Sequence, residues 1–221
     1  SPASLTFTAA NAFTPQMVTV TGVDDLVADG EVNYQVITAP AASADAVYRG
    51  LNAADVSVRN TDDDAAGITV TPRSGLVTTE AGGTATFTVV LNSVPVANVT
   101  IGLSSSDATE GTVLPTALTF TPSNALTPQT ATVTGLNDTL IDGVVAYTIV
   151  TAPAASGDPG YNGVNAPDVS ATNTDNDTAG IVVTPASGLV TSEVGGSRAT
   201  FTVVLTATPA AHTKAYFRDV V

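Results

Sequence analysis

The sequence predicts an all-β chain built from tandem, antiparallel, immunoglobulin-like β-sandwiches. Three features of its 221 residues lead to this fold class. A long segment recurs at a shift of about 113 residues, apolar side chains alternate with threonine at a period of two, and turns rich in Gly, Pro, Asn and Asp separate the alternating stretches. No stretch has helical periodicity, so we expect strands throughout.

The repeat relates residues 2–83 to residues 115–196. Leu5-Thr6-Phe7-Thr8, for example, returns as Leu118-Thr119-Phe120-Thr121. A period of this length matches one independently folding domain rather than the short unit of a solenoid. We therefore expect one complete module over 66–177, flanked by two partial ones. Residues 1–65 resemble the later part of a module, with its last four strands, and residues 178–221 resemble the first part, with its first three.

Seven strands are expected in the complete module. They lie near 67–79, 84–92, 98–104, 117–122, 129–136, 144–151 and 167–174. In the second of these, Ala85, Phe87, Val89 and Leu91 alternate with Thr84, Thr86, Thr88 and Val90, and an outward threonine suits an exposed pleat. Seven short strands in about 110 residues indicate an antiparallel sandwich of immunoglobulin-like type.

The composition excludes several partners and chemistries. Twenty Asp and Glu against six Lys and Arg give a formal net charge of −14, which repels nucleic acid and anionic membrane surfaces. The absence of Cys excludes disulfides, thiolate zinc sites, iron–sulfur clusters and cysteine nucleophiles. No apolar run approaches the roughly 20 residues of a spanning helix. We expect no nucleic-acid partner, no membrane insertion and an extracellular location, secreted or at the cell surface.

The sequence gives no indication of catalysis. The single histidine, His212, lies in the variable tail and has no Gly-x-Ser-x-Gly elbow near it. The paired carboxylates of Asp138 and Asp142 lie in a repeated loop without the aromatic residues that line a sugar-binding cleft. We therefore expect a protein that is not an enzyme.

The acidic residues of the complete module concentrate in loops that a sandwich places at one pole. Because successive strands alternate in direction, the loops after the first, third and fifth strands and the end of the seventh fall on the same side. These segments carry Glu80, Asp107, Glu110, Asp138, Asp142, Asp175 and Asp177. Gathered carboxylates repel one another, and Ca²⁺, which takes six to eight oxygen ligands in loose geometry, fits the set better than Mg²⁺ or Zn²⁺. The sequence predicts a calcium site here; the alternative is that the aspartates only cap turns.

The same residues resemble the Calx-beta domain, a calcium-binding β-sandwich of sodium–calcium exchangers and of large bacterial surface proteins. Glu80 in Val77-Thr78-Thr79-Glu80, the loop 137–143 and the terminal Asp175-Asn176-Asp177 match its pattern. The resemblance implies that Glu80, Asp107, Asp138, Asp142, Asp175 and Asp177 are candidate ligands, with Asn176 in place of the family's middle terminal Asp. The matching residues of the partial modules are Asp24, Asp25, Asp29, Asp62, Asp63, Asp64 and Glu193.

The two partial modules are complementary. The C-terminal strands of one molecule are suited to complete the N-terminal half-sandwich of the next, and such a contact does not close, so it generates a fibre. The resulting hypothesis is a calcium-stabilised extracellular structural protein that assembles head to tail with copies of itself into a filament. The alternative is a fragment of a large tandem-repeat adhesin stalk or other cell-surface protein.

Overall fold

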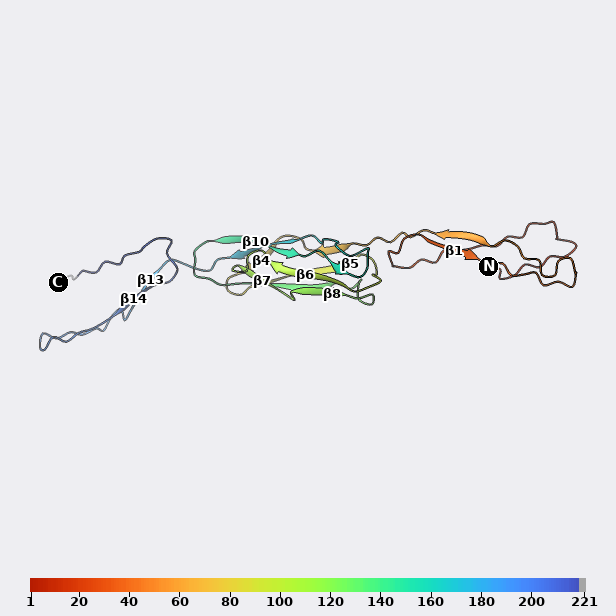
Figure 1. Cartoon of the computed structure of the whole chain (residues 1–221). Helices are drawn as coiled ribbons and strands as arrows, with labels where there is room; N and C mark the ends of the chain where they lie inside the picture. Colours follow the sequence, from red (N-terminus) through yellow and green to blue (C-terminus); the bar gives the residue numbers. More distant parts are fainter. Residues whose placement is uncertain (219–221) are drawn as a thin grey trace. The chain divides into compact units, whose positions relative to one another are not determined.

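A computed structural model describes residues 1–218 of the chain (Figure 1). The secondary structure of these residues consists of strands without helices, which confirms the predicted all-β class. The described part of the chain thus contains no helix with the length and apolarity needed to cross a membrane. The chain divides into two compact units, Ser1–Ala66 and Gly67–Val221. The last residues of the expected third segment, 219–221, lie outside the described residues.

The complete sandwich is made of two sheets. The first has the strand order β3 (Ile68–Thr71), β5 (Thr84–Leu91), β9 (Gln129–Gly135) and β7 (Gly111–Leu114), all antiparallel. The second has the order β11 (Ala155–Ser156), β6 (Val99–Ser105), β10 (Val144–Thr151), β12 (Val169–Thr174) and β4 (Leu76–Thr79), and β8 (Ala117–Phe120) also pairs with β6. All seven expected strand regions are strands in the structure.

The inward side chains of both sheets form the core of this sandwich. Phe87, Val89 and Leu91 are buried on β5, whereas Thr88 and Val90 between them are half-buried and Thr86 before them is exposed. The alternation expected for this strand is therefore present. Phe120 on β8 is fully buried as well. The apolar stripe of each strand thus becomes one face of a shared core.

The first expected strand, 67–79, is in fact two strands in different sheets. β3 pairs with β5, whereas β4 pairs in parallel with β12. Pro72 and Gly75 lie between them; proline lacks the N–H that a ladder needs, and Gly75 adopts a φ of 80° that favours glycine. These two residues let the chain cross from one sheet to the other.

Two short strands were not expected. β7 lies in what the sequence indicated as the acidic loop 105–116, and β11 has only two residues. Within β7 only Gly111 and Val113 are buried, so the alternation is too short to be recognised from sequence. β7 directly follows Glu110, one of the predicted ligands, and so fixes its position.

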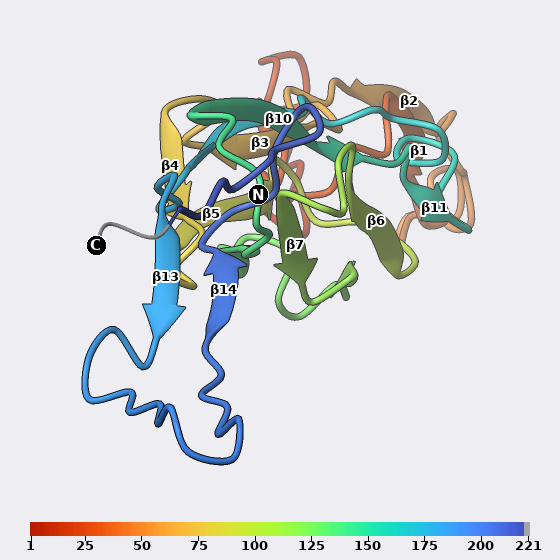
Figure 2. The same cartoon turned by 90° about the vertical axis from the view of Figure 1, so that its left-hand side faces the viewer.

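The flanking segments form fewer strands than expected. In the first unit β1 (Val32–Val36) pairs with β2 (Val56–Asn60), while 4–7 and 16–22, which correspond to β8 and β9, are not strands. Beyond the sandwich β13 (Ile181–Thr184) pairs with β14 (Thr202–Leu205), joined by a long loop that Figure 2 shows. The third expected strand, near 212–218, is absent from the described residues. In the sandwich β8 pairs with β6, and β9 pairs with β5. The counterparts of β8 and β9 lie in the first unit, whereas those of β6 and β5 lie beyond the sandwich, so each missing strand lacks a partner within its own segment.

Candidate metal centre

Four loop segments bring carboxylates together at one pole of the sandwich. The first group contains Glu80 after β4, and Asp175 and Asp177 after β12. The second group contains Glu110 before β7, and Asp138 and Asp142 in the β9–β10 loop. Within each group, one oxygen of every carboxylate lies within 4.8 Å of the others. The strand directions thus place six of the predicted ligands where the sequence expected them.

Glu80 anchors the first group. Its backbone N–H donates to the carbonyl oxygen of Thr174 at 3.0 Å, which continues the β4–β12 pairing by one residue. Its side chain is only 3% exposed, and Oε2 accepts a hydrogen bond from the backbone N–H of Asn176 at 3.1 Å. The carboxylate is therefore held against the segment that follows β12.

The pKa of Glu80 is raised above that of an ordinary glutamate. The hydrogen bond from Asn176 acts to lower this pKa because it favours the charged form. Burial and the negative charges of the three nearby residues Asp138, Asp175 and Asp177 outweigh that bond. The folded chain therefore holds a buried carboxylate that is unfavourably charged.

Asp175 organises the loops around the first group. Oδ1 accepts a hydrogen bond from the N–H of Asp177 at 2.6 Å, and Oδ2 accepts from Gly143 at 2.9 Å and Asp142 at 3.1 Å. These bonds, with that of Asp177 first, lower the pKa of Asp175. Asp175 is thus charged near neutral pH and ties the β9–β10 loop to the end of β12.

Asp177 has an oxygen that the fold leaves without a partner. Its Oδ2 is buried and accepts no hydrogen bond within the described part of the chain. A buried acceptor without a partner costs free energy, and a charged one costs more. Asp177 belongs to the group with Glu80 and Asp175. A cation bound there would supply the missing partner.

Glu110 anchors the second group through a buried polar network. Its side chain is 5% exposed, and Oε2 accepts a hydrogen bond from Asn173 Nδ2 at 3.3 Å. Asn173 is itself buried, donates to the carbonyl oxygen of Leu136 at 3.0 Å and accepts from Thr78 Oγ1 at 3.0 Å. Burial raises the pKa of Glu110, and the neighbouring Asp142 adds to this, while the bond from Asn173 opposes it.

The side chains of two further predicted ligands, Asp107 and Asn176, form hydrogen bonds within and between the loops. Asp107 lies in neither group: its Oδ1 accepts from the N–H of Thr109 at 3.0 Å and from Thr109 Oγ1 at 2.6 Å. Its bonds from Thr109 lower the pKa of Asp107, which fits the turn-capping alternative. The side-chain amide of Asn176 donates to Asn137 Oδ1 at 3.0 Å, and thereby links two of the loops.

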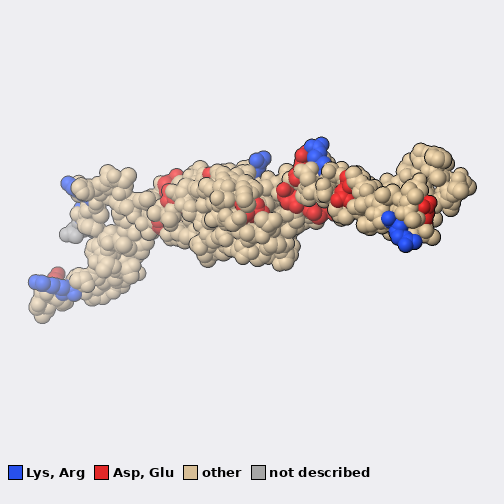
Figure 3. Space-filling model, turned by 45° about the vertical axis from the view of Figure 1, so that its right-hand side comes forward, with Lys and Arg blue, Asp and Glu red and all other residues tan. Residues whose placement is uncertain are grey.

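None of the grouped carboxylates is paired with a basic side chain. Among residues 1–218 the single ion pair joins Arg59 to Glu31, at 2.7 Å in the first unit. Figure 3 shows the few Lys and Arg side chains as separate patches on a surface that is largely uncharged. Buried carboxylates are normally paired or bound to metal, so the chain itself does not neutralise this pole.

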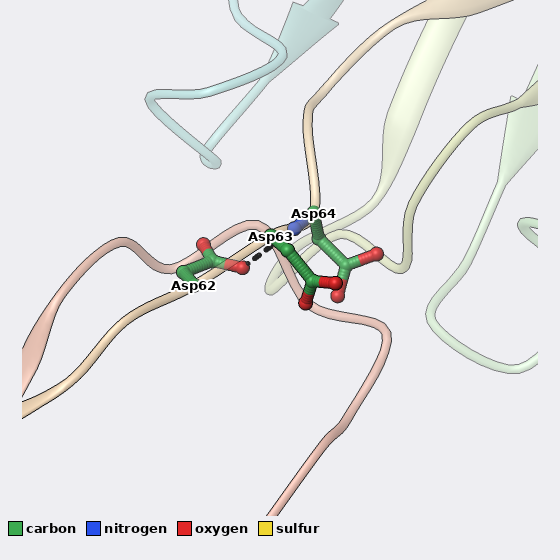
Figure 4. A group of neighbouring side chains, drawn as sticks. All are labelled: Asp62, Asp63 and Asp64. Atoms are coloured by element: carbon green, nitrogen blue, oxygen red, sulfur yellow. Dashed lines mark hydrogen bonds between the residues drawn. The ribbon is translucent and has the colours of Figure 1, made fainter.

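The first unit contains a third acidic group, Asp62, Asp63 and Asp64 (Figure 4). Asp62 Oδ2 accepts from Gly30 N at 2.7 Å and Oδ1 accepts from Asp64 N at 2.8 Å, as Asp175 does from Gly143 and Asp177. A pocket beside the group is also lined by Asp24, Asp25 and Asp29. The hydrogen bonds from Asp64 and Gly30 lower the pKa of Asp62. Desolvation raises the pKa of Asp64, and the negative charge of Asp62 raises it further.

Glu193 stands apart from the other predicted ligands. It is exposed in the loop between β13 and β14 and belongs to none of the three groups among the described residues. Glu80, its counterpart in the repeat, meets Asp175 and Asp177 because they follow β12. Residues 178–218 contain no strand corresponding to β12, so Glu193 finds no partners there.

The sequence did not point to the polar network behind the second group. Thr78 Oγ1 is 2.9 Å from the hydroxyl oxygen of Tyr147 and connects it to Asn173. A usable signal was present, because an asparagine stands at an inward-facing strand position in both repeats, as Asn60 and Asn173. A polar side chain retained on a core face needs buried partners.

Comparisons with known proteins give distant likenesses. No family model and no curated protein sequence matches the chain. The apo form of the Calx CBD1 domain is similar over 50% of this chain and 96% of that one, with 14% identity and a TM-score of 0.39. The calcium-binding domain CBD12 of CALX1.1 is similar over 50% of this chain and 45% of that one, with 16% identity and a TM-score of 0.38. Domains 4 and 5 of the S-layer protein SbsC are similar over 66% of this chain and 70% of that one, with 13% identity and a TM-score of 0.30. These values indicate a distant β-sandwich resemblance.

Proposed function

We propose that the chain is a non-enzymatic, Calx-beta-like structural protein of the extracellular space, stabilised by calcium and assembling head to tail with its own copies. The orphaned, buried oxygen of Asp177 beside Glu80 and Asp175 is the observation that supports calcium most directly. Two buried glutamates without a basic partner add to it. A cation in the first group would relieve the cost at Asp177 and Glu80, and a cation in the second group would relieve the cost at Glu110.

The donor set favours calcium among the common cations. The pole offers carboxylate oxygens, with the amide oxygen of Asn137 nearby, and no His or Cys, which zinc prefers. The ligands come from loops of different length, and Ca²⁺ tolerates the irregular geometry that Mg²⁺ does not. When bound, an ion in the first group would join the loop after β4 to the segment after β12, and an ion in the second group would join the loops after β6 and β9.

Thermal unfolding of the whole chain in calcium and in chelator tests this proposal. At a calcium concentration about 100-fold above Kd, a single site that forms only in the folded state adds about 2.7 kcal/mol. For a sandwich of this size the midpoint then rises by about 10 °C. Magnesium at the same concentration is the control. An unchanged midpoint in calcium contradicts the proposal.

Exposed apolar side chains in both flanking segments support assembly. Phe7 and Val20 in the first unit, and Phe201 and Val204 beyond the sandwich, are all large, apolar and exposed. Apolar surface of this kind favours association with a protein partner. Sedimentation velocity over a range of protein concentrations measures it. We expect species larger than one chain, and a monomer at every concentration contradicts the assembly.

A further inference from the structure

We infer that the first unit of one copy and the segment 178–218 of another complete a sandwich together, in the strand register that the central sandwich already displays. This inference rests on the proposed assembly and specifies its contact. The sandwich serves as the template: residues 1–66 correspond to its second half, and residues from 180 onward to its first half.

The flanking segments already have half of this register. The β1–β2 pair Val32 with Asn60 corresponds to the β10–β12 pair Val145 with Asn173, 113 residues later. The β13–β14 pair Ile181 with Leu205 corresponds to the β3–β5 pair Ile68 with Leu91. Each flanking segment therefore forms the strand pairs of the template that lie inside its own half.

The pairs that join the two halves of the template are the ones missing from the flanking segments. In the sandwich, β5 pairs with β9, β6 with β8, and β4 with β12. The counterparts of β8, β9 and β4 lie at 4–7, 16–22 and 189–192, and none of them is a strand. A second copy supplies the partner strand in each case, because the two halves lie in different segments of the chain.

The side chains left exposed are those that the template buries. Phe87 is 1% exposed, but its counterpart Phe201 is 44% exposed. Phe120 is fully buried, but its counterpart Phe7 is 57% exposed. Joining the two halves returns these rings to a core, and burial of the apolar rings stabilises the contact. The exposed faces of the two segments are therefore complementary to each other, which favours a second copy of the chain as the occupant.

The template fixes which residues meet. The β5–β9 pair Thr86 with Thr132 places Thr200 of one copy opposite Thr19 of the next. The counterpart of Glu80 is Glu193, and those of Asp175 and Asp177 are Asp62 and Asp64. The same register therefore brings Glu193 of one copy to Asp62 and Asp64 of the next, so both copies contribute to an acidic group that neither completes alone.

Cysteine cross-linking tests the register, because the natural chain contains no Cys. Thr19→Cys and Thr200→Cys are placed in separate chains, mixed with calcium present and mildly oxidised. Directly opposite strand residues have Cα atoms close enough for a disulfide. Thr19→Cys with Val204→Cys is the matched control: it lies on the same face of the same strand, about 13 Å further along. Since each chain has one Cys, every disulfide joins two chains.

The expected result is a covalent dimer from the first mixture, with the peptides around 19 and 200 joined, and at least tenfold less from the control mixture. Equal yields from both mixtures contradict the register. The register is also wrong if residues 19 and 200 do not link while the unmodified chain sediments as an oligomer. Neither result contradicts the proposed assembly itself. A monomeric unmodified chain overturns the assembly and this inference together.

Discussion

The substitution Asp177→Asn separates the destabilisation caused by the buried carboxylate from the stabilisation that bound calcium would provide. In the folded chain Asp177 Oδ2 is buried without a hydrogen-bond partner, a cost of roughly 1–3 kcal/mol. An asparagine of nearly the same shape replaces the charge and can direct N–H groups to Glu80 and Asp175. In chelator we therefore expect the variant to be more stable than the natural chain by about 1–3 kcal/mol, or roughly 4–12 °C in midpoint.

In calcium the order reverses. The natural chain gains the binding free energy, whereas the variant has lost one carboxylate ligand and gains less. Thermal unfolding by circular dichroism, with and without chelator, measures both effects. Asp168→Asn is the control, because Asp168 is exposed, lies at the start of β12, away from the pole, and its acceptor role toward Thr151 is kept by the amide oxygen. If Asp177→Asn destabilises the chain in chelator, or keeps the full calcium response, the account of this oxygen is wrong.

Three further predictions concern the sandwich. Gly135→Ala introduces a Cβ that collides with the carbonyl oxygen of Thr79, so we expect chemical denaturation to show a loss of about 1–3 kcal/mol in the free energy of unfolding. Gly102→Ala is the control and costs less, because its Cβ makes an ordinary 3.4 Å contact. Equal losses in the two variants contradict this. Tyr161→Phe removes a hydroxyl that accepts a hydrogen bond from Ser93 N at 3.0 Å and donates one to Ser93 O at 2.8 Å, and so leaves buried groups unpaired. We expect urea unfolding to show a loss of about 1–3 kcal/mol in the free energy of unfolding. An unchanged midpoint refutes this prediction. In chelator, the raised pKa values of the two buried glutamates mean that the folded chain binds protons more tightly than the unfolded one, so its thermal midpoint rises as pH falls from about 7 to about 5. Below about pH 4 the aspartates with lowered pKa reverse this gain, and a midpoint that falls steadily from pH 7 contradicts the assignment.

Much of the fold was predictable because strand periodicity is local. Phe87 and its neighbours alternate over eight residues, and that pattern is visible in the sequence. The crossing at Pro72 and Gly75 was missed because both halves of the stretch have strand character, and only pairing partners distant in sequence assign them to different sheets. The missing strand at 16–22 was mispredicted for the same reason: its sequence suits a strand, but a strand needs a partner.

The convergence of the acidic loops was also predictable, because strand order alone determines which loops share a pole. The sequence did not indicate which of the acidic side chains are buried. Glu80 and Glu110 are covered, whereas Asp107 caps its own turn, and these differences depend on contacts with β12 and on the side chain of Asn173. The isolation of Glu193 follows from the absence of a β12-like strand in its segment, which sequence similarity to Glu80 does not reveal.

Direct calcium binding tests the proposed metal centre. Equilibrium dialysis of the whole chain against labelled calcium is compared for the natural protein, Asp177→Asn and Asp168→Asn. We predict saturable binding by the natural protein, loss of one class of sites in Asp177→Asn and no loss in Asp168→Asn. No saturable binding, or the same isotherm for all three proteins, contradicts a calcium centre built on Glu80, Asp175 and Asp177.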